Sequence, residues 1–368
     1  MTTSRTNRPM TAEADSLYSV DRPRLTALLS DEPRYRVEQI WRGLYVEHRV
    51  PAEMTNLPLA LRERLEAALP AELTLARDSV SEGGMTHKYL WRLDDGATIE
   101  SVLMHSPDRS TVCVSTQAGC AMACSFCATG QAGFDRHLRS GEIVAQVVEA
   151  ARRAEGRRVS NVVFMGMGEP LANYDATLGA VERIHDDLGL SARHLTISTV
   201  GVLPGIRRLA TERLPITLAV SLHAASDELR DELVPLNRRA PLAALAEACG
   251  EYLAAKGRRL SFEWAMISDV NDTDEQAELL AAYVRPLRAH VNLIPLNPTP
   301  GYAVRGSRRE RIEEFRNHLS ARGVNATIRR TRGSDIDAAC GQLRIGELDP
   351  KEPDQRSRRA AGPRVLPD

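Results

Sequence analysis

The hydrophobic pattern along the chain changes period twice. Residues 15–70 carry apolar side chains at helical spacing, i, i+3, i+4, i+7 and i+8, as at Val37, Ile40, Trp41, Leu44 and Tyr45. Residues 71–109 change to short alternating runs separated by glycine and aspartate turns, which is typical of antiparallel strands. The pattern therefore predicts a small helical accessory domain followed by a small antiparallel β section.

From residue 110 onward, apolar runs of strand length alternate with amphipathic segments. Runs without polar alternation are typical of strands buried on both faces of a parallel sheet. The strand candidates span residues 111–115, 161–165, 194–198, 216–222, 260–266 and 290–295. This regular βα repetition predicts an α/β protein with a partial (β/α)6 TIM-like barrel over residues 110–346, in preference to a doubly wound sheet. Functional side chains are then expected where strands end.

Both ends of the chain lack these patterns. Residues 1–14 are polar without periodicity and residues 347–368 are rich in Pro, Arg and Asp, so both are expected to be disordered. No run reaches the roughly 18 apolar residues of a membrane span, and the polar start has no signal-peptide core. With 43% hydrophobic and 26% charged residues, the chain is expected to be a globular, cytoplasmic protein with no membrane partner.

Charge is balanced globally and uneven locally. Lys plus Arg number 48 and Asp plus Glu 49, a net charge of -1, so the whole chain does not indicate a nucleic-acid binder. Residues 302–333, however, hold nine arginines and three acidic residues, a local charge of +6. An anionic partner explains this excess, and so does a solvated helix face with ion pairs.

Three cysteines give the strongest chemical signal. Cys120, Cys124 and Cys127 form a C-x3-C-x2-C sequence directly after the first predicted barrel strand. A structural zinc site is normally closed by four ligands, whereas a 4Fe-4S cubane held by three thiolates keeps one iron open for a substrate or cofactor. A zinc knuckle with a distant fourth ligand and three packed thiols are the alternatives. The spacing and position favour the iron–sulfur cluster.

This spacing, in the first βα loop of a βα-repeat chain, resembles the radical S-adenosylmethionine (SAM) superfamily. The resemblance implies that the open iron binds the amino and carboxylate groups of SAM, which one electron then cleaves to a 5'-deoxyadenosyl radical. Gly166-Met167-Gly168-Glu169-Pro170 matches the GGE-like motif of the superfamily, so that Gly168 and Glu169 would receive the amino group of SAM. Further SAM contacts are implied at other strand ends, although each alone is also an ordinary polar strand terminus: Ser198, Ser221, Leu222, His223 and Asn297.

Longer segments narrow the resemblance to the RlmN family. They are VCVSTQAGC (112–120), GF (133–134), MGMGEPL (165–171), SLHA (221–224), NLIPLNP (292–298) and RGSDIDAACGQL (332–343). The family consists of radical SAM RNA methyltransferases that act on carbon 2 of an adenosine in 23S ribosomal RNA and, in many members, of a transfer RNA anticodon-loop adenosine. The match spans residues 33–343, and the helical N-terminal segment contacts RNA in the family. It also implies a monomer served by an electron donor such as a flavodoxin or ferredoxin.

The resemblance assigns roles to three more residues. Carbon 2 of adenine is electron-poor and cannot attack the SAM methyl group, so a radical route is needed. Cys340 matches the cysteine that carries the transferred methyl group, and Cys113 matches the cysteine that attacks the Cys340 sulfur to release product, leaving a Cys113–Cys340 disulfide. Glu100 matches the base that removes the carbon-2 proton. Each of the three is otherwise explained as an ordinary core cysteine or strand glutamate.

Two rival functions remain at this point. A related antibiotic-resistance branch methylates carbon 8 of the same kind of adenosine with the same cysteine pair, and sequence motifs do not separate the two. A non-catalytic, zinc-stapled RNA-binding protein explains the clustered cysteines and the arginine-rich segment, but not Cys113, Cys340 and Gly168-Glu169. In the enzyme, the arginine-rich segment would hold RNA phosphates while the target base is flipped toward the cluster.

Overall fold

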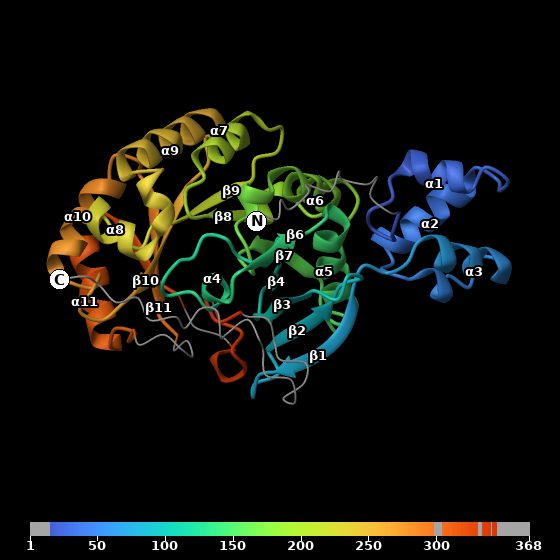
Figure 1. Ribbon diagram of the computed structural model, residues 1–368, viewed down its shortest axis with the longest axis horizontal. Helices are drawn as coiled ribbons and strands as arrows, with labels where there is room; N and C mark the ends of the chain where they lie inside the picture. The colour runs from blue at the N-terminus through green and yellow to red at the C-terminus, as the bar shows by residue number, and fades with distance from the viewer. Residues whose placement is uncertain (1–14, 298–303, 330–332, 340, 344–368) are drawn as a thin grey trace, which may run out of the picture.

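The computed structural model describes residues 15–297, 304–329, 333–339 and 341–343. Cys340 and the two ends expected to be disordered, 1–14 and 347–368, lie outside these residues. The main feature is one ten-stranded sheet in the order β1-β2-β3-β4-β7-β8-β9-β10-β11-β12, with helices against it (Figure 1). No described helix is long and apolar enough to cross a membrane.

The second part of this sheet is parallel throughout. Its strands are β4 (Ser110–Cys113), β7 (Val159–Phe164), β8 (Leu195–Thr199), β9 (Thr217–Ser221), β10 (Ser261–Met266), β11 (His290–Pro295) and β12 (Asn325–Ile328). The first six correspond to the strands predicted from the sequence, which confirms the α/β class. The seventh, β12, is an addition that the sequence analysis missed.

The antiparallel strands belong to the same sheet. They are β1 (Thr74–Val80), β2 (Thr86–Arg92) and β3 (Thr98–His105). Strand β3 pairs antiparallel with β4, so that Val102 lies opposite Cys113. The antiparallel section is therefore a direct extension of the parallel strands. A separate two-stranded sheet, β5 (Gln117–Gly119) and β6 (Phe134–His137), frames the cysteine loop.

The large sheet curls around its own interior. A cavity of about 510 Å³ is lined by residues from every strand between β3 and β12, which is consistent with a sheet curved into the predicted partial barrel. Strand alternation explains how the sequence does this. In β8, the buried Leu195 and Ile197 join the hydrophobic core, while Thr196 between them lines the cavity.

Helices cover the outer face of the curved sheet (Figure 1). They are α5 (Ser140–Arg152), α6 (Tyr174–Asp186), α7 (Leu203–Thr211), α9 (Leu242–Lys256), α10 (Asp274–Val284) and α11 (Arg309–Ala321). Two shorter helices, α4 (Ala128–Ala132) and α8 (Asp227–Leu233), lie in loops after strands. Short 3-10 turns occur at Pro51–Glu53, Pro170–Asn173, Ala192–His194, Pro235–Arg238 and Ser334–Ile336.

The N-terminal helices α1 (Arg22–Leu28), α2 (Tyr35–Tyr45) and α3 (Leu59–Ala68) gather at one end of the molecule (Figure 1). The apolar stripe predicted from the sequence is the buried face of α2. The indole Nε1 of Trp41 donates to Asp187 Oδ1 at 2.9 Å, and Arg183 donates to the backbone oxygens of Tyr18, Ser19 and Val20. These contacts attach the helical segment to the end of α6.

Candidate functional site

The three clustered cysteines lie in the loop between β5 and α4. The backbone fixes this loop at both ends, since Cys120 N donates to Gly133 O at 2.7 Å and Ser125 N donates to Leu233 O at 3.1 Å. Burial and the neighbouring Cys127 thiol raise the pKa of Cys120 to about 11, and burial raises the pKa of Cys124 as well. Crowded, buried thiols of this kind become stable thiolates when a cation binds them, so the donor set fits a metal centre. Among the described residues, no three His, Cys, Asp or Glu side chains are arranged as a single-ion site.

The glycine-rich turn after β7 lies directly against the strand that leads to this loop. Thr116 N and Gln117 N both donate to Met167 O, at 2.8 and 3.2 Å. A Cβ at Gly166 would lie 2.7 Å from Val114 O, so glycine is required for this approach. Gly168 has a φ of +101° and leaves no room for a Cβ beside Gln117. The turn and the cysteine segment are thus one rigid unit.

Glu169 follows this turn and is 2% exposed. Its Oε1 accepts from Leu171 N at 3.0 Å and its Oε2 accepts from Val200 N at 2.8 Å, which ties the ends of β7 and β8 together. Burial raises the pKa of Glu169 to about 7. An acceptor in this position is suited to an amino group of a bound ligand.

His223 stands at the end of β9 with an unusual backbone φ of +61°. Its Nδ1 accepts from Ala265 N at 3.0 Å, so the proton of the neutral ring is on Nε2. Burial lowers the pKa of His223 to about 3, and its ring centroid lies 4.6 Å from that of Phe126. The side chain is therefore a fixed, neutral donor at the cavity wall.

A smaller cavity, of about 150 Å³, brings most of the predicted cofactor residues together. Its walls include Cys124, Cys127, Gly168, Glu169, Ser198, Ser221 and His223. The hydroxyls of Ser198 and Ser221 are 3.4 Å apart. The walls do not include three of the predicted residues, namely Cys120, Leu222 and Asn297. The Leu222 side chain is in the hydrophobic core, and Asn297 lines the larger cavity.

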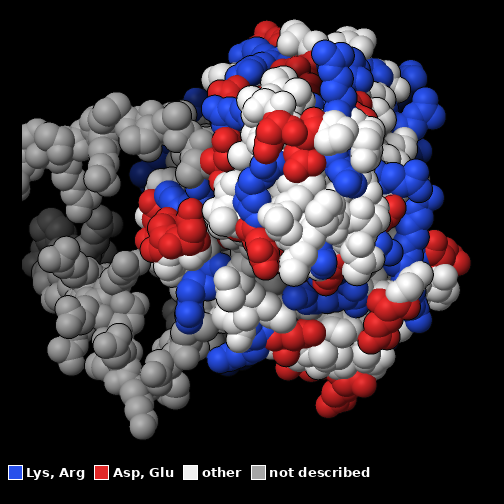
Figure 2. All heavy atoms as spheres, turned by 90° about the vertical axis from the view of Figure 1, so that its right-hand side faces the viewer, with Lys and Arg blue, Asp and Glu red and all other residues white. Residues whose placement is uncertain are grey.

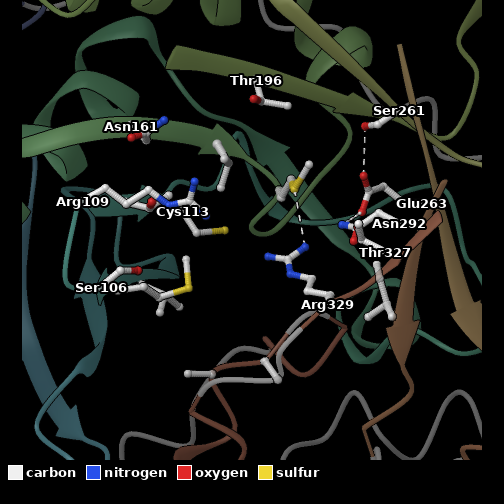
Figure 3. Close-up of a pocket in the computed structure, with 18 of the residues that line it drawn as sticks. Ser106, Arg109, Cys113, Asn161, Thr196, Ser261, Glu263, Asn292, Thr327 and Arg329 are labelled. Carbon is white, nitrogen blue, oxygen red and sulfur yellow. Dashed lines mark hydrogen bonds between the residues drawn. The ribbon is translucent and has the colours of Figure 1, made fainter. Parts of the chain in front are cut away.

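The larger cavity, shown in Figure 3, holds Cys113 on its wall. Cys113 is 6% exposed and comes from the end of β4. Cys340 itself lies outside the described residues. Its neighbour Ala339 lines the larger cavity and Gly341 lines the smaller one. The segment that carries position 340 thus borders both cavities.

Glu100 is 3% exposed on β3 and is ion-paired with Lys88. The Lys88 Nζ lies 3.2 Å from Glu100 Oε1 and also donates to Asp337 O at 3.3 Å. On β3, Glu100 shares a face with Val102, which lines the larger cavity. Lys88 therefore links Glu100 to the segment that leads to position 340.

Three functional candidates were missed from the sequence, and a fourth, Arg329, was expected to contact RNA phosphates. The sequence did mark Lys88 as unusual, because the chain has only two other lysines and its remaining Lys and Arg residues are all arginines. Glu263 also had one, as the single charge in the apolar run of β10. Arg230 had none, since it lies in a charged helical stretch typical of a solvated surface. Arg329 was assigned to the surface segment that holds RNA phosphates, but its side chain points into the larger cavity (Figure 3).

Arg230, on α8, is fully buried and braces two of the strand ends. Its guanidinium donates to Val200 O at 2.6 Å, to Leu222 O at 3.1 Å and to Ser221 O at 3.3 Å. A further bond reaches Asn237 Oδ1 at 2.8 Å. Burial lowers the pKa of Arg230, and the Cys124 thiol is one of the groups that counter this shift.

The arginine-rich segment has many internal partners. On α11, Arg309 pairs with Glu313 and Arg311 with Asp274 of α10, and Arg322, directly after α11, pairs with Glu278 of α10. Around the N-terminal helices, arginines and acidic side chains are likewise interspersed (Figure 2). The pairs there include Arg22–Glu38, Arg24–Asp15, Arg42–Glu47 and Arg64–Asp31. These contacts favour the solvated-face explanation for the arginines of α11.

Comparison with known proteins agrees with this arrangement. Residues 114–281 match the model of the Radical SAM superfamily. A protein of Salinispora tropica named "Probable dual-specificity RNA methyltransferase RlmN" is 53% identical over 86% of this chain and 88% of its own length. The chain belongs to the RlmN family. A second relative, "Dual-specificity RNA methyltransferase RlmN 1" of Myxococcus xanthus, is 51% identical over 89% of this chain and 94% of its own.

A solved structure gives the same result. The crystal structure of a radical SAM methyltransferase from Sphaerobacter thermophilus superposes with a TM-score of 0.88 at 50% identity, covering 90% of this chain and all of that one. As a member of the RlmN family, the chain is a SAM-dependent radical SAM RNA methyltransferase. This membership favours an enzyme over the zinc-stapled RNA-binding protein.

Proposed function

We propose that this enzyme methylates carbon 2 of an adenosine in 23S ribosomal RNA and of a transfer RNA anticodon-loop adenosine. One observation carries the proposal. The smaller cavity, with its cysteine, glycine-turn and strand-end residues, lies next to a larger cavity that holds Cys113, and the segment around position 340 borders both. A cofactor site beside a substrate site with a reactive thiol is the arrangement that cysteine-mediated methyl transfer requires.

Two cofactors are part of the proposal. Cys120, Cys124 and Cys127 would hold a 4Fe-4S cluster, and Glu169, with the strand-end hydroxyls and His223, would hold SAM. When bound, the cluster and SAM together would supply the methyl group and a carbon-centred radical. The cluster needs one electron, so a one-electron donor of the flavodoxin or ferredoxin type is part of the proposal.

The chain's own residues divide the remaining work. Cys340 carries the carbon unit that becomes bonded to the base. Glu100 accepts the carbon-2 proton, and Lys88 fixes its carboxylate through the 3.2 Å ion pair. The Cys113 thiolate then attacks the Cys340 sulfur, the bond between that sulfur and the transferred carbon breaks, and the freed carbon takes up a proton to become the methyl group of the released RNA. The step has the form of thiol–disulfide exchange. The resulting Cys113–Cys340 disulfide must be reduced before the next cycle.

The experiment that tests this function is mass spectrometry of ribosomal and transfer RNA from cells with and without the gene. Digested RNA should contain 2-methyladenosine only when the gene is present, in both RNA classes. A gene-dependent 8-methyladenosine would identify the carbon-8 branch instead. Restoring the gene with Cys340→Ala is the control, and it should leave the RNA unmodified.

A further inference from the structure

Glu263 stands at the junction of the two cavities. It is the third residue of β10, is 5% exposed, and lines both the larger and the smaller cavity. Burying a carboxylate is costly unless donors surround it. None of the roles proposed above uses Glu263, although it faces the space between the cofactor residues and Cys113.

Two neighbours hold the Glu263 carboxylate in place. Ser261 Oγ donates to its Oε1 at 3.1 Å, and Asn292 Nδ2 donates to its Oε2 at 2.8 Å (Figure 3). Each carboxylate oxygen has about two acceptor positions, so each of these bonds leaves capacity for a further donor. The carboxylate is therefore preorganised to accept a hydrogen bond from a ligand in the cavity.

Arg329 provides the positive charge at the same junction. It lines both cavities, and in Figure 3 its guanidinium reaches into the space between Cys113 and Glu263. Burial raises the pKa of Glu263, while Arg329 and the bonds from Asn292 and Ser261 act in the opposite direction. The Arg329 guanidinium, a hydrogen-bond donor, and the Glu263 carboxylate, an acceptor, thus face the junction of the two cavities. This pair suits a planar ligand that has both donor and acceptor groups along its edge.

We propose that Glu263 recognises the target adenine by accepting a hydrogen bond from its exocyclic 6-amino group. The proposal rests on the adenosine substrate proposed above. Guanine presents an oxygen at the corresponding position, and a carboxylate repels an oxygen acceptor, as it would repel a phosphate. Glu263 would therefore select adenine over guanine and hold the purine in the cavity that contains Cys113.

A double-mutant cycle, with one change in the protein and one in the RNA base, tests this contact. Wild-type protein and the Glu263→Gln and Glu263→Ala variants, each reconstituted anaerobically with iron and sulfide, are given an RNA hairpin that carries adenosine or purine riboside at the target position. Purine riboside lacks only the 6-amino group. For adenosine, kcat/KM should fall about tenfold or more in Glu263→Ala, and for purine riboside less than about threefold. Glu263→Gln keeps one acceptor oxygen and should give an intermediate ratio.

For each variant, kcat/KM with adenosine is divided by kcat/KM with purine riboside, and this ratio is compared with the wild-type ratio. The comparison removes differences in intrinsic reactivity between the two bases and in the fraction of active enzyme. Thr196→Val, on β8 and two strands away from Glu263 in the wall of the larger cavity, is the matched control and should keep the wild-type ratio. Iron content, SAM affinity and RNA affinity are measured for every variant. A loss of SAM affinity in Glu263→Ala would show that Glu263 serves the cofactor, and equal losses for both RNAs would contradict the contact. If wild-type protein does not methylate adenosine, the proposed function fails rather than this inference.

Discussion

At the scale of single residues, the site is built from charged groups that are buried beside neutral polar partners. Glu169 accepts from two backbone amides, and Glu263 accepts from a serine and an asparagine. Such groups are expensive to bury and are retained where chemistry needs them. Glu169 could be predicted because it follows a recognisable glycine turn. Glu263 stands out as the single charge in an apolar strand, but its role could not be predicted, because no recognisable motif surrounds it in the sequence.

The two special cysteines should behave differently when each is replaced. Cys340→Ala has no sulfur to carry the methyl group, so it should be inactive and form no adduct with RNA. Cys113→Ala should stall one step later and accumulate protein covalently linked to RNA, because the thiolate that releases the product is absent. Denaturing electrophoresis with and without RNase measures the adduct. Full turnover by Cys113→Ala, or an adduct with Cys340→Ala, would contradict the assignment.

Glu169 gives a pH-dependent prediction for the protein without cofactors. Burial raises the pKa of Glu169 from 4.5 to about 7, so the stability that its protonated form contributes is present below pH 4.5 and is lost as the pH rises through 7. Glu169→Gln cannot ionise. Between these pH values the variant should gain stability relative to wild type, by up to about 3 kcal/mol. Urea unfolding at several pH values measures this, and parallel pH profiles for the two proteins would refute it.

At the scale of elements, the parallel strands were predictable because each is a continuous apolar run bounded by turn residues. Strand β12 was not, because Asn325–Ile328 is short, is only partly buried, and lies in a segment dominated by arginines. The pairing of β3 with β4 was also missed, since a sequence shows where strands are but not which ones share an edge. The cavities follow from the curl of the sheet, which depends on those pairings.

Helix α8 gives the prediction at this scale. Arg230→Ala removes the donors to Val200 O, Ser221 O and Leu222 O, of which Leu222 O keeps its bond from Ala224 N, and it leaves a void in the fully buried space of the side chain. Stability to urea should fall by about 2–4 kcal/mol. Arg207→Ala is the matched control, because Arg207 is exposed on α7 and only pairs with Glu247 and Glu251. That change should cost less than about 1 kcal/mol. Similar losses for both variants would refute the bracing role.

At the scale of the whole molecule, the N-terminal helices are fixed to the barrel through a few polar contacts around an apolar interface. Arg183 donates to three successive backbone oxygens of the segment before α1, while Trp41 reaches Asp187. This arrangement sets the position of the helical segment relative to the cavities. The helices were predictable from their 3.6-residue period, but their attachment point was not, because it depends on contacts between residues over a hundred positions apart.

Arg183→Ala should loosen this attachment without disturbing the barrel. Backbone amides of α1 and α2 should exchange with deuterium faster than in wild type, while amides of β8 and β9 keep their protection. Arg213→Ala is the control, since its exposed pair with Asp186 lies near the same end of α6. Unchanged exchange in α1 and α2 would show that Arg183 is not needed for the attachment and that the other contacts, such as Trp41–Asp187, suffice.

The central claim is that the two cavities act as one site that places a methyl group on carbon 2 of adenosine. The most direct measurement uses an RNA substrate with deuterium at carbon 2 of the target adenosine and the reconstituted, anaerobic enzyme with SAM and a reductant. Mass spectrometry and deuterium NMR of the digested product should show one added methyl group and no deuterium at carbon 2, the position being read by NMR because the base can return the deuteron to the new methyl group. A methylated adenosine that retains the carbon-2 deuterium would contradict the account.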